Sequence, residues 1–276
     1  MKLAYHTYAF GSRGWLPAWT LEEAIRLSAE LGFAGLELAA CRPHGWPSDL
    51  GATRRRDIRG LAGGFGLAVS AICFNLVNHN IASPIAEERA GALAYGIECL
   101  DLAADLDCHL VTIGGGWSVR PHSRLEAWSW AGELLAGLAG EAEKRGVVLA
   151  LENINSQRAD VVVSTADVAW MIAELRCANL QPMIDFYHLH LEGEDPLAAV
   201  ARFGSSLAHV HFLDARRADR SRQAPGAGEL PLVAILEALN SSGYHGWLTA
   251  ELWGSDPLEI GRRTTAFFAD LKLPGA

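Results

Sequence analysis

Four polar side chains stand at or near the ends of four apolar runs, and all four are types that bind metal ions or transfer protons. Glu152 ends VVLALE, Asp185 ends QPMID, His211 lies late in LAHVH, and Glu251 ends WLTAE. A carboxylate in such a place is partly desolvated, which is costly unless a cation or hydrogen bonds compensate. Three clustered carboxylates would repel one another, whereas a divalent cation turns the same arrangement into a ligand shell.

For any one of these residues alone, helix capping, a solvent contact or a satisfied core position is the more common role. The four runs are consecutive, however, and each polar residue lies at the same relative height. We therefore predict one divalent metal ion bound by Glu152, Asp185, His211 and Glu251. Side-chain alternation points His209 and His211 the same way, with His209 one layer deeper, as a structural residue or a partner that orients a ligand.

The elements that must position these residues are short apolar runs that alternate with segments of helical spacing. Continuous apolar strands separated by helices indicate a parallel sheet covered on both sides, and eight such units close into a (β/α)₈ TIM barrel. We expect one domain over residues 1–276. An open doubly wound sheet is the alternative fold, but the segment GSRGW after the first predicted strand lacks the GxGxxG spacing that is typical of it. The predicted strands are 3–10, 35–40, 68–74, 109–115, 147–153, 181–186, 207–213 and 247–252. The predicted helices lie within 20–32, 83–106, 124–146, 164–176, 195–204, 231–243 and 255–271.

Composition excludes several classes of protein. The chain of 276 residues is 50% hydrophobic, and its five cysteines form no CxxC pair, which argues against a zinc ribbon or a disulfide framework. A formal net charge of −9 disfavours binding to the negatively charged phosphates of a nucleic acid, and the basic run at 54–59 fits a solvated helix face. No apolar stretch of about 18 residues predicts a membrane span, and the N-terminus has no signal-peptide pattern. We expect a cytoplasmic protein that binds neither nucleic acid nor membranes.

Together the segments LALEN, PMIDFYH, AHVHFLDAR…PGAGEL and GWLTAELW resemble, in order and spacing, the xylose isomerase-like TIM barrel superfamily. This superfamily includes sugar and sugar-phosphate isomerases and epimerases, with hydroxypyruvate isomerase, inosose dehydratase and AP endonucleases as relatives. The resemblance covers essentially the whole chain, including GFAGLEL, which looks like the second-strand glutamate of the family. It implies a carbohydrate substrate and an assembly as a homodimer or homotetramer.

The resemblance to the ketose 3-epimerase group also implies roles for individual residues. Glu152, Asp185, His211 and Glu251 match the metal shell of that group, and Glu152 and Glu251 match its two acid/base residues. His188 and Arg217 match positions that bind substrate oxygens. Where those epimerases often have a further glutamate, this chain has Arg158, which indicates a more anionic ligand.

Three further features near the predicted mouth of the barrel are candidates for substrate binding. Glu37 is predicted to bind a substrate hydroxyl, with a cap or an ion pair as the alternative. Trp117 follows GGG and is predicted to stack on a sugar face, with an anchored flexible loop as the alternative. The segment 216–228 carries four arginines after the seventh strand, where barrels often bind phosphate, although a solvated basic loop is an equally good interpretation.

The resemblance implies a metal-dependent isomerase or epimerase of a small sugar, keto-sugar or sugar phosphate, and the chemistry of this residue set agrees with it. Removing a proton next to a carbonyl requires an enediolate, which a Lewis-acid metal stabilises while flanking carboxylates take and return the proton. An oxygen-rich shell fits Mn²⁺ or Mg²⁺ best, with Zn²⁺ or Co²⁺ as alternatives. The main rival is a dehydratase of the inosose or dehydroshikimate type; an AP endonuclease or a non-catalytic sugar-binding barrel is disfavoured.

Overall fold

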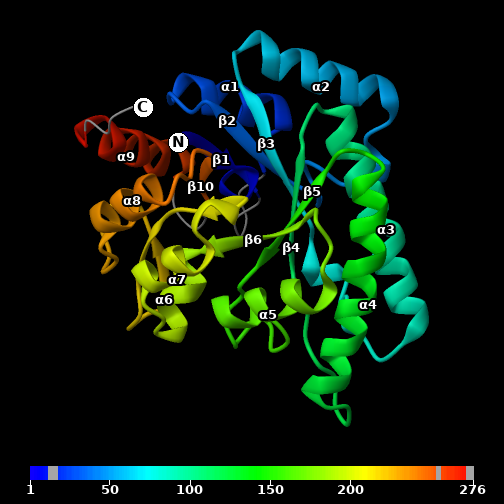
Figure 1. The fold of residues 1–276 in the computed structure, drawn as a ribbon. Coiled ribbons are helices and arrows are strands. Elements are labelled where there is room, and N and C mark those ends of the chain that lie inside the picture. The colour runs from blue at the N-terminus through cyan, green and yellow to red at the C-terminus, as the bar shows by residue number, and fades with distance from the viewer. Residues whose placement is uncertain (12–17, 253–255, 272–276) are drawn as a thin grey trace.

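Eight parallel strands form a closed barrel in the computed structural model, which describes residues 1–11, 18–252 and 256–271. Neighbouring strands pair in chain order around the ring, and the last strand pairs with the first, so the predicted TIM barrel is confirmed (Figure 1). The barrel strands are β1 (Lys2–His6), β2 (Gly35–Ala39), β3 (Ala68–Cys73), β4 (Leu110–Gly114), β5 (Val148–Glu152), β6 (Leu180–Asp185), β7 (His209–His211) and β10 (Trp247–Ala250).

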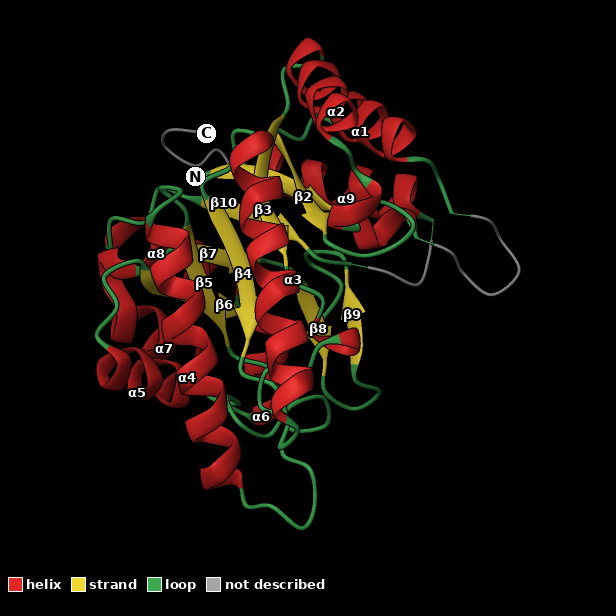
Figure 2. Ribbon diagram, turned by 90° about the vertical axis from the view of Figure 1, so that its right-hand side faces the viewer, coloured by secondary structure: helices red, strands yellow, loops and turns green. Residues whose placement is uncertain are grey.

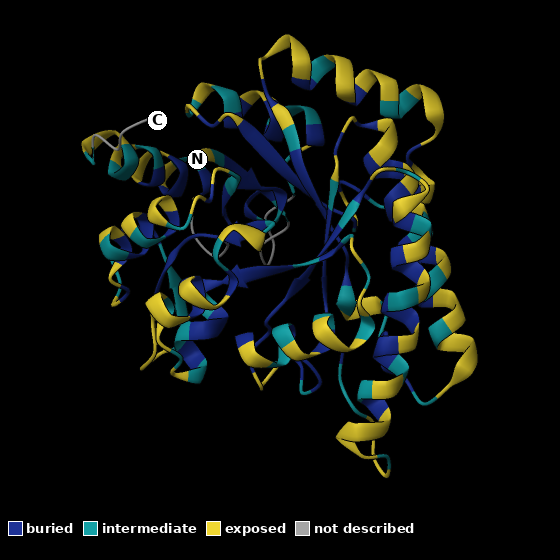
Figure 3. Cartoon of the chain, in the orientation of Figure 1, coloured by how far each residue is buried: buried dark blue, intermediate teal, exposed yellow. Residues whose placement is uncertain are grey.

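The helices surround the barrel and bury one face each against it. Figure 3 shows the strands as buried, while the helices that cover them expose their outer faces. Side-chain caps begin several helices where the sequence predicts them; Thr20 and Ser123 each form a capping box with the glutamate three residues later. The helices are α1 (Leu21–Glu30), α2 (Ala52–Gly64), α3 (Ala86–Asp105), α4 (Arg124–Glu143), α5 (Thr165–Leu175), α6 (Phe186–Glu192), α7 (Pro196–Phe203), α8 (Leu232–Ser241) and α9 (Pro257–Asp270).

The first strand is shorter than the sequence suggests. The prediction of a strand over 3–10 is wrong in its second half, because β1 ends at His6 and the chain enters a 3₁₀ helix, Thr7–Phe10. The His6 Nδ1 atom accepts a hydrogen bond of 3.1 Å from the backbone N–H of Tyr8 and so caps this turn. Further 3₁₀ turns occupy Pro47–Asp49, Leu76–Asn78 and Gly204–Ser206.

Strand register brings the ends of the barrel strands to one level. Asp185 pairs with His211, and His211 pairs with Thr249, two residues before Glu251. Strand β5 lies next to β6, and its last residue, Glu152, pairs with Gly114, the last residue of β4. Because parallel strands of a barrel all end at the same face, their last side chains meet at its mouth.

A short antiparallel hairpin interrupts the barrel pattern after β7, and the sequence analysis does not predict it. Strand β8 (Asp214–Arg216) pairs with β9 (Ser221–Gln223), and Figure 2 shows both beside the ring of barrel strands rather than within it. The hairpin therefore carries the basic segment 216–228 back toward the barrel.

The buried carboxylate of Asp214 fixes the base of this hairpin. It accepts hydrogen bonds from four backbone N–H groups, those of Ala215, Gly226, Gly228 and Leu230, at 2.8–3.1 Å. Charge-assisted bonds of this kind are stronger than neutral ones. They hold the loop 224–230 against the start of the hairpin.

None of the helices in the described ranges combines the length and the apolar character needed to cross a membrane.

The base of the hairpin leaves no room for a side chain at Gly228. A β-carbon there would lie against the Asp214 carboxylate and 2.5 Å from the carbonyl oxygen of Ala215. This oxygen is a backbone atom and cannot easily move away. We expect Gly228→Ala to lower the free energy of unfolding by about 1–3 kcal/mol, the usual cost of overpacking, in urea denaturation. Gly60→Ala is the control: it lies within α2 with nothing near its β-carbon position, and we expect it to raise stability by about 0.5–1 kcal/mol. Equal effects of the two substitutions would contradict this account of the hairpin.

Candidate functional site

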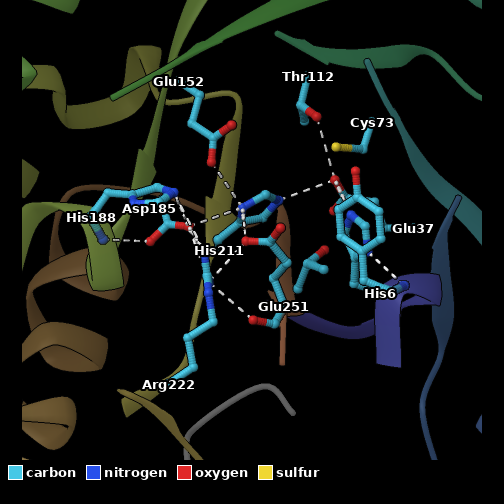
Figure 4. Close-up of polar contacts among 12 residues, drawn as sticks. His6, Glu37, Cys73, Thr112, Glu152, Asp185, His188, His211, Arg222 and Glu251 are labelled. Carbon is cyan, nitrogen blue, oxygen red and sulfur yellow. Dashed lines mark hydrogen bonds and ion pairs between the residues drawn. The ribbon is translucent and has the colours of Figure 1, made fainter. Parts of the chain in front are cut away.

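Four buried side chains from β5, β6, β7 and the residue after β10 converge at the mouth of the barrel (Figure 4). The His211 Nδ1 atom lies 3.2 Å from Glu152 Oε1, 3.4 Å from Asp185 Oδ2 and 3.2 Å from Glu251 Oε2. One ligand atom from each of the four residues lies within 4.8 Å of all the others. The structure thus brings together the four residues that the sequence analysis assigns to a metal.

The donor set fits a divalent cation. Glu37 accepts a hydrogen bond from the Nε2 atom of His211 at 3.1 Å, so Nε2 carries the proton and Nδ1 directs a lone pair at the three carboxylates. His211 Nδ1 is buried and has no hydrogen-bond partner among the described residues. A lone pair facing three anionic oxygens is repulsive unless a proton on Nδ1 or a metal ion lies between them. Oxygen-rich sets with one imidazole suit Mn²⁺ or Mg²⁺.

Glu37 lies beneath His211, and its contacts with two histidines match the alternative interpretation of this residue as part of an ion pair. Strand β2 continues two residues beyond Glu37, which pairs in register with His6 and sits one layer below the strand ends. Its carboxylate is fully buried and also accepts a bond of 2.7 Å from His209 Nε2. His209 therefore lies one layer deeper than His211 and contacts Glu37, which orients the His211 ring.

Burial and the charges of neighbouring groups shift the pKa values of this cluster in opposite directions. Burial raises the pKa of Glu152 to about 7. Burial alone would also raise the pKa values of Asp185 and Glu251, but the positive charge of Arg222 and neighbouring histidines outweighs it and lowers both. Likewise, burial alone would lower the pKa of His211, but the carboxylates around it raise that pKa well above the usual value. The cluster thus attracts positive charge strongly.

A cavity of about 650 Å³ opens directly above the cluster. Its size suits a ligand of one or two sugar rings. Glu152 and Glu251 form part of its floor, and three residues predicted to bind substrate also line it: His188, Arg158 and Trp117.

His188 is held rigidly beside the metal-site candidates. Its backbone N–H donates to Asp185 Oδ1 at 2.9 Å, and its Nδ1 atom lies 2.5 Å from the side-chain nitrogen of Asn155. Burial lowers the pKa of the His188 imidazole to about 4. The Nε2 atom of this imidazole lies 3.4 Å from Arg222 Nη2, at the edge of the cavity.

Arg217, which the resemblance assigns to substrate binding, is not among the residues that line this cavity. It lies at the turn of the β8–β9 hairpin, exposed, and its guanidinium donates to the carbonyl oxygen of His190 at 2.6 and 3.0 Å. The three-residue length of β7 sends the chain into the hairpin at that point, away from the mouth.

Arg222 is the arginine of the hairpin that lies beside the cluster. Its side chain is only 4% exposed, and Nη1 lies 2.9 Å from Glu251 Oε2. The basic composition of 216–228 was the only signal for it in the sequence. That composition does not reveal which of four arginines returns to the barrel, because the hairpin register decides it.

Comparisons with known proteins agree with this geometry. The family model described as xylose isomerase-like TIM barrel matches residues 25–271. Fructoselysine 3-epimerase of Escherichia coli is 26% identical over 237 residues, covering 84% of this chain and 85% of the relative. D-psicose 3-epimerase of Ruminiclostridium cellulolyticum is 27% identical over 251 residues, covering 88% and 81%. The crystal structure of 3-keto-D-glucoside 4-epimerase from Escherichia coli superimposes with a TM-score of 0.82 at 23% identity, covering 98% of this chain and 99% of that one.

The position of Glu37 predicts that it controls metal affinity without touching the metal. In Glu37→Gln, the amide cannot accept from both His209 and His211 with the strength of a carboxylate, so the His211 ring loses its fixed tautomer and orientation. We expect the dissociation constant for Mn²⁺ of the metal-free protein to rise about 10- to 100-fold in calorimetric titration.

The control is Glu30→Gln, which removes an exposed glutamate of α1 that pairs with Arg26 on the surface. It should bind Mn²⁺ as the unaltered protein does. Wild-type affinity in Glu37→Gln would show that Glu37 has no part in orienting His211.

Proposed function

Because the chain belongs to the xylose isomerase-like TIM barrel family, we propose that it is a divalent-metal-dependent isomerase or epimerase of a small sugar, keto-sugar or sugar phosphate. One observation carries the proposal: three carboxylates converge on one imidazole nitrogen at the floor of a cavity that suits such a substrate. The named relatives are sugar epimerases, which supports the same class of reaction. Mn²⁺ or Mg²⁺ is the proposed cofactor, with Zn²⁺ or Co²⁺ as alternatives.

Glu152, Asp185, His211 and Glu251 would hold the ion. When bound, it would supply Lewis-acid stabilisation of negative charge on the substrate oxygens. The remaining chemistry belongs to the chain itself, above all to the two glutamates that line the cavity.

Glu152 and Glu251 are the proposed acid/base pair. They project from β5 and from the end of β10, two strands that are separated in the barrel by β6 and β7. Carboxylates approaching from separate strands can remove a proton from one side of a carbon next to the carbonyl and return one from the other. That exchange inverts a carbinol or moves a carbonyl while the mass of the sugar is conserved.

Cavity-lining residues would orient the substrate over this pair. His188 lines the cavity and would contact a substrate hydroxyl, and Trp117 offers an aromatic face to a sugar ring. Arg158 brings a positive charge to the wall of the cavity, which favours a substrate with an anionic group. The burial of the floor excludes water from the reacting carbon.

The reaction class is tested with a panel of free and phosphorylated ketoses, each incubated with Mn²⁺ in deuterated water. We expect a product of unchanged carbon skeleton that carries one solvent deuterium, detected by NMR and mass spectrometry. A chelator should abolish turnover, and Mn²⁺ should restore it. Loss of water from the substrate would identify a dehydratase instead, and metal binding without exchange on any sugar would favour a binding protein.

Glu152→Gln and Glu251→Gln should each lower the turnover number by about 10²- to 10⁴-fold or more, because each removes a group that accepts and returns a proton. The thermal unfolding transition should remain cooperative in both variants. Glu143→Gln removes the same charge from an exposed position near the end of α4 and should retain full activity. Activity within threefold of wild type in either active-site variant would refute its role as acid or base.

A further inference from the structure

Arg222 places a fixed positive charge against the proposed metal ligands. Its Nη1 atom lies 2.9 Å from Glu251 Oε2, and both Nη1 and Nη2 lie 3.4 Å from Asp185 Oδ2 (Figure 4). Only 4% of the side chain is exposed. A guanidinium this deeply buried is stable only when anions compensate its lost hydration.

The oxygens that Arg222 contacts are the same atoms that face His211. Asp185 Oδ2 lies 3.4 Å from His211 Nδ1, and Glu251 Oε2 lies 3.2 Å from it. The guanidinium and a metal ion bound beside Nδ1 would therefore share two ligand oxygens. Each cation draws electron density from those oxygens and repels the other.

The rest of the structure holds Arg222 in this place. Nη1 also donates to the carbonyl oxygen of Glu251 at 3.0 Å, and the guanidinium lies 4.1 Å from the ring centre of Tyr187. The hairpin that carries it is anchored by the four hydrogen bonds to Asp214. The surrounding structure thus fixes the guanidinium of Arg222 beside the carboxylates.

Charge counting shows what this cation does. Glu152, Asp185 and Glu251 carry three negative charges when ionised, and Arg222 reduces their sum to two. A divalent ion then brings the group to neutrality, whereas without Arg222 it would leave one negative charge. Without any metal, Arg222 is the permanent cation in direct contact with two of the three carboxylates.

We propose that Arg222 is a resident counter-cation of the metal site, which stabilises the carboxylate shell when no metal is bound and lowers its affinity for divalent ions. The inference rests on the proposed function only in taking these carboxylates as metal ligands. A residue that merely oriented the ligands would have the opposite effect, since its removal would weaken metal binding.

The test compares Arg222→Met, Arg222→Lys and Arg216→Met with the unaltered protein, all stripped of metal. Mn²⁺ affinity is measured by calorimetric titration, and the thermal midpoint is measured with and without saturating Mn²⁺. Arg222→Met removes the charge and keeps an unbranched side chain, and Arg222→Lys retains the charge. Arg216→Met removes a charge from an exposed position on the same hairpin.

We expect Arg222→Met to bind Mn²⁺ at least about tenfold more tightly, because a like charge within a few ångströms of the ion is gone. Its metal-free form should melt below the metal-free wild type, and saturating Mn²⁺ should narrow that gap. Arg222→Lys and Arg216→Met should bind Mn²⁺ within about threefold of wild type. Should Arg222→Met not fold without metal, Mn²⁺ should restore its native circular dichroism spectrum.

Unchanged or weaker Mn²⁺ binding by Arg222→Met overturns the proposal, as does a failure of Mn²⁺ to restore an unfolded variant. These readouts do not depend on catalysis. If the unaltered protein epimerises no sugar but the affinities shift as expected, the proposed function fails and this inference stands. If the protein is an active epimerase and the affinities do not shift, only this inference fails.

Discussion

Like charge concentrated in a buried place is the constraint around which the mouth of this barrel is organised. Three carboxylates lie within 3.2–3.4 Å of a single imidazole nitrogen, and water has little access to any of them. Such a group is unstable unless positive charge enters it. Every polar neighbour of the cluster can be understood as a response to that requirement, either by supplying positive charge or by fixing the geometry in which a cation is received.

Positive charge and orientation come from two opposite sides. From below, His209 and Glu37 form a hydrogen-bonded chain that ends on the Nε2 atom of His211 and turns its other nitrogen upward. From the side, Arg222 compensates Asp185 and Glu251 directly. The lower layer decides which way the imidazole faces, and the hairpin decides how much negative charge remains for an ion.

The fold and the four central residues were predictable because they follow from regular local patterns. Apolar strands recur with helices between them, and the parallel strands of a barrel all end at one face. The polar residues near the ends of 147–153, 181–186 and 207–213 must therefore meet. Sequence patterns are less informative where this regularity stops. Glu37 lies inside β2 and not at its end, and the chain after β7 forms a hairpin that the sequence analysis does not predict.

The sequence by itself determined the barrel, the order of its elements and the set of side chains at its mouth, because hydrophobic periodicity and strand alternation are properties of neighbouring residues. Only the tertiary structure decided which polar residue lies above another and which arginine of four enters the site. Those choices depend on strand register and on the geometry of an irregular hairpin, which are set by contacts between residues far apart in the chain. The buried carboxylate of Asp214, which gathers four backbone N–H groups, is such a contact.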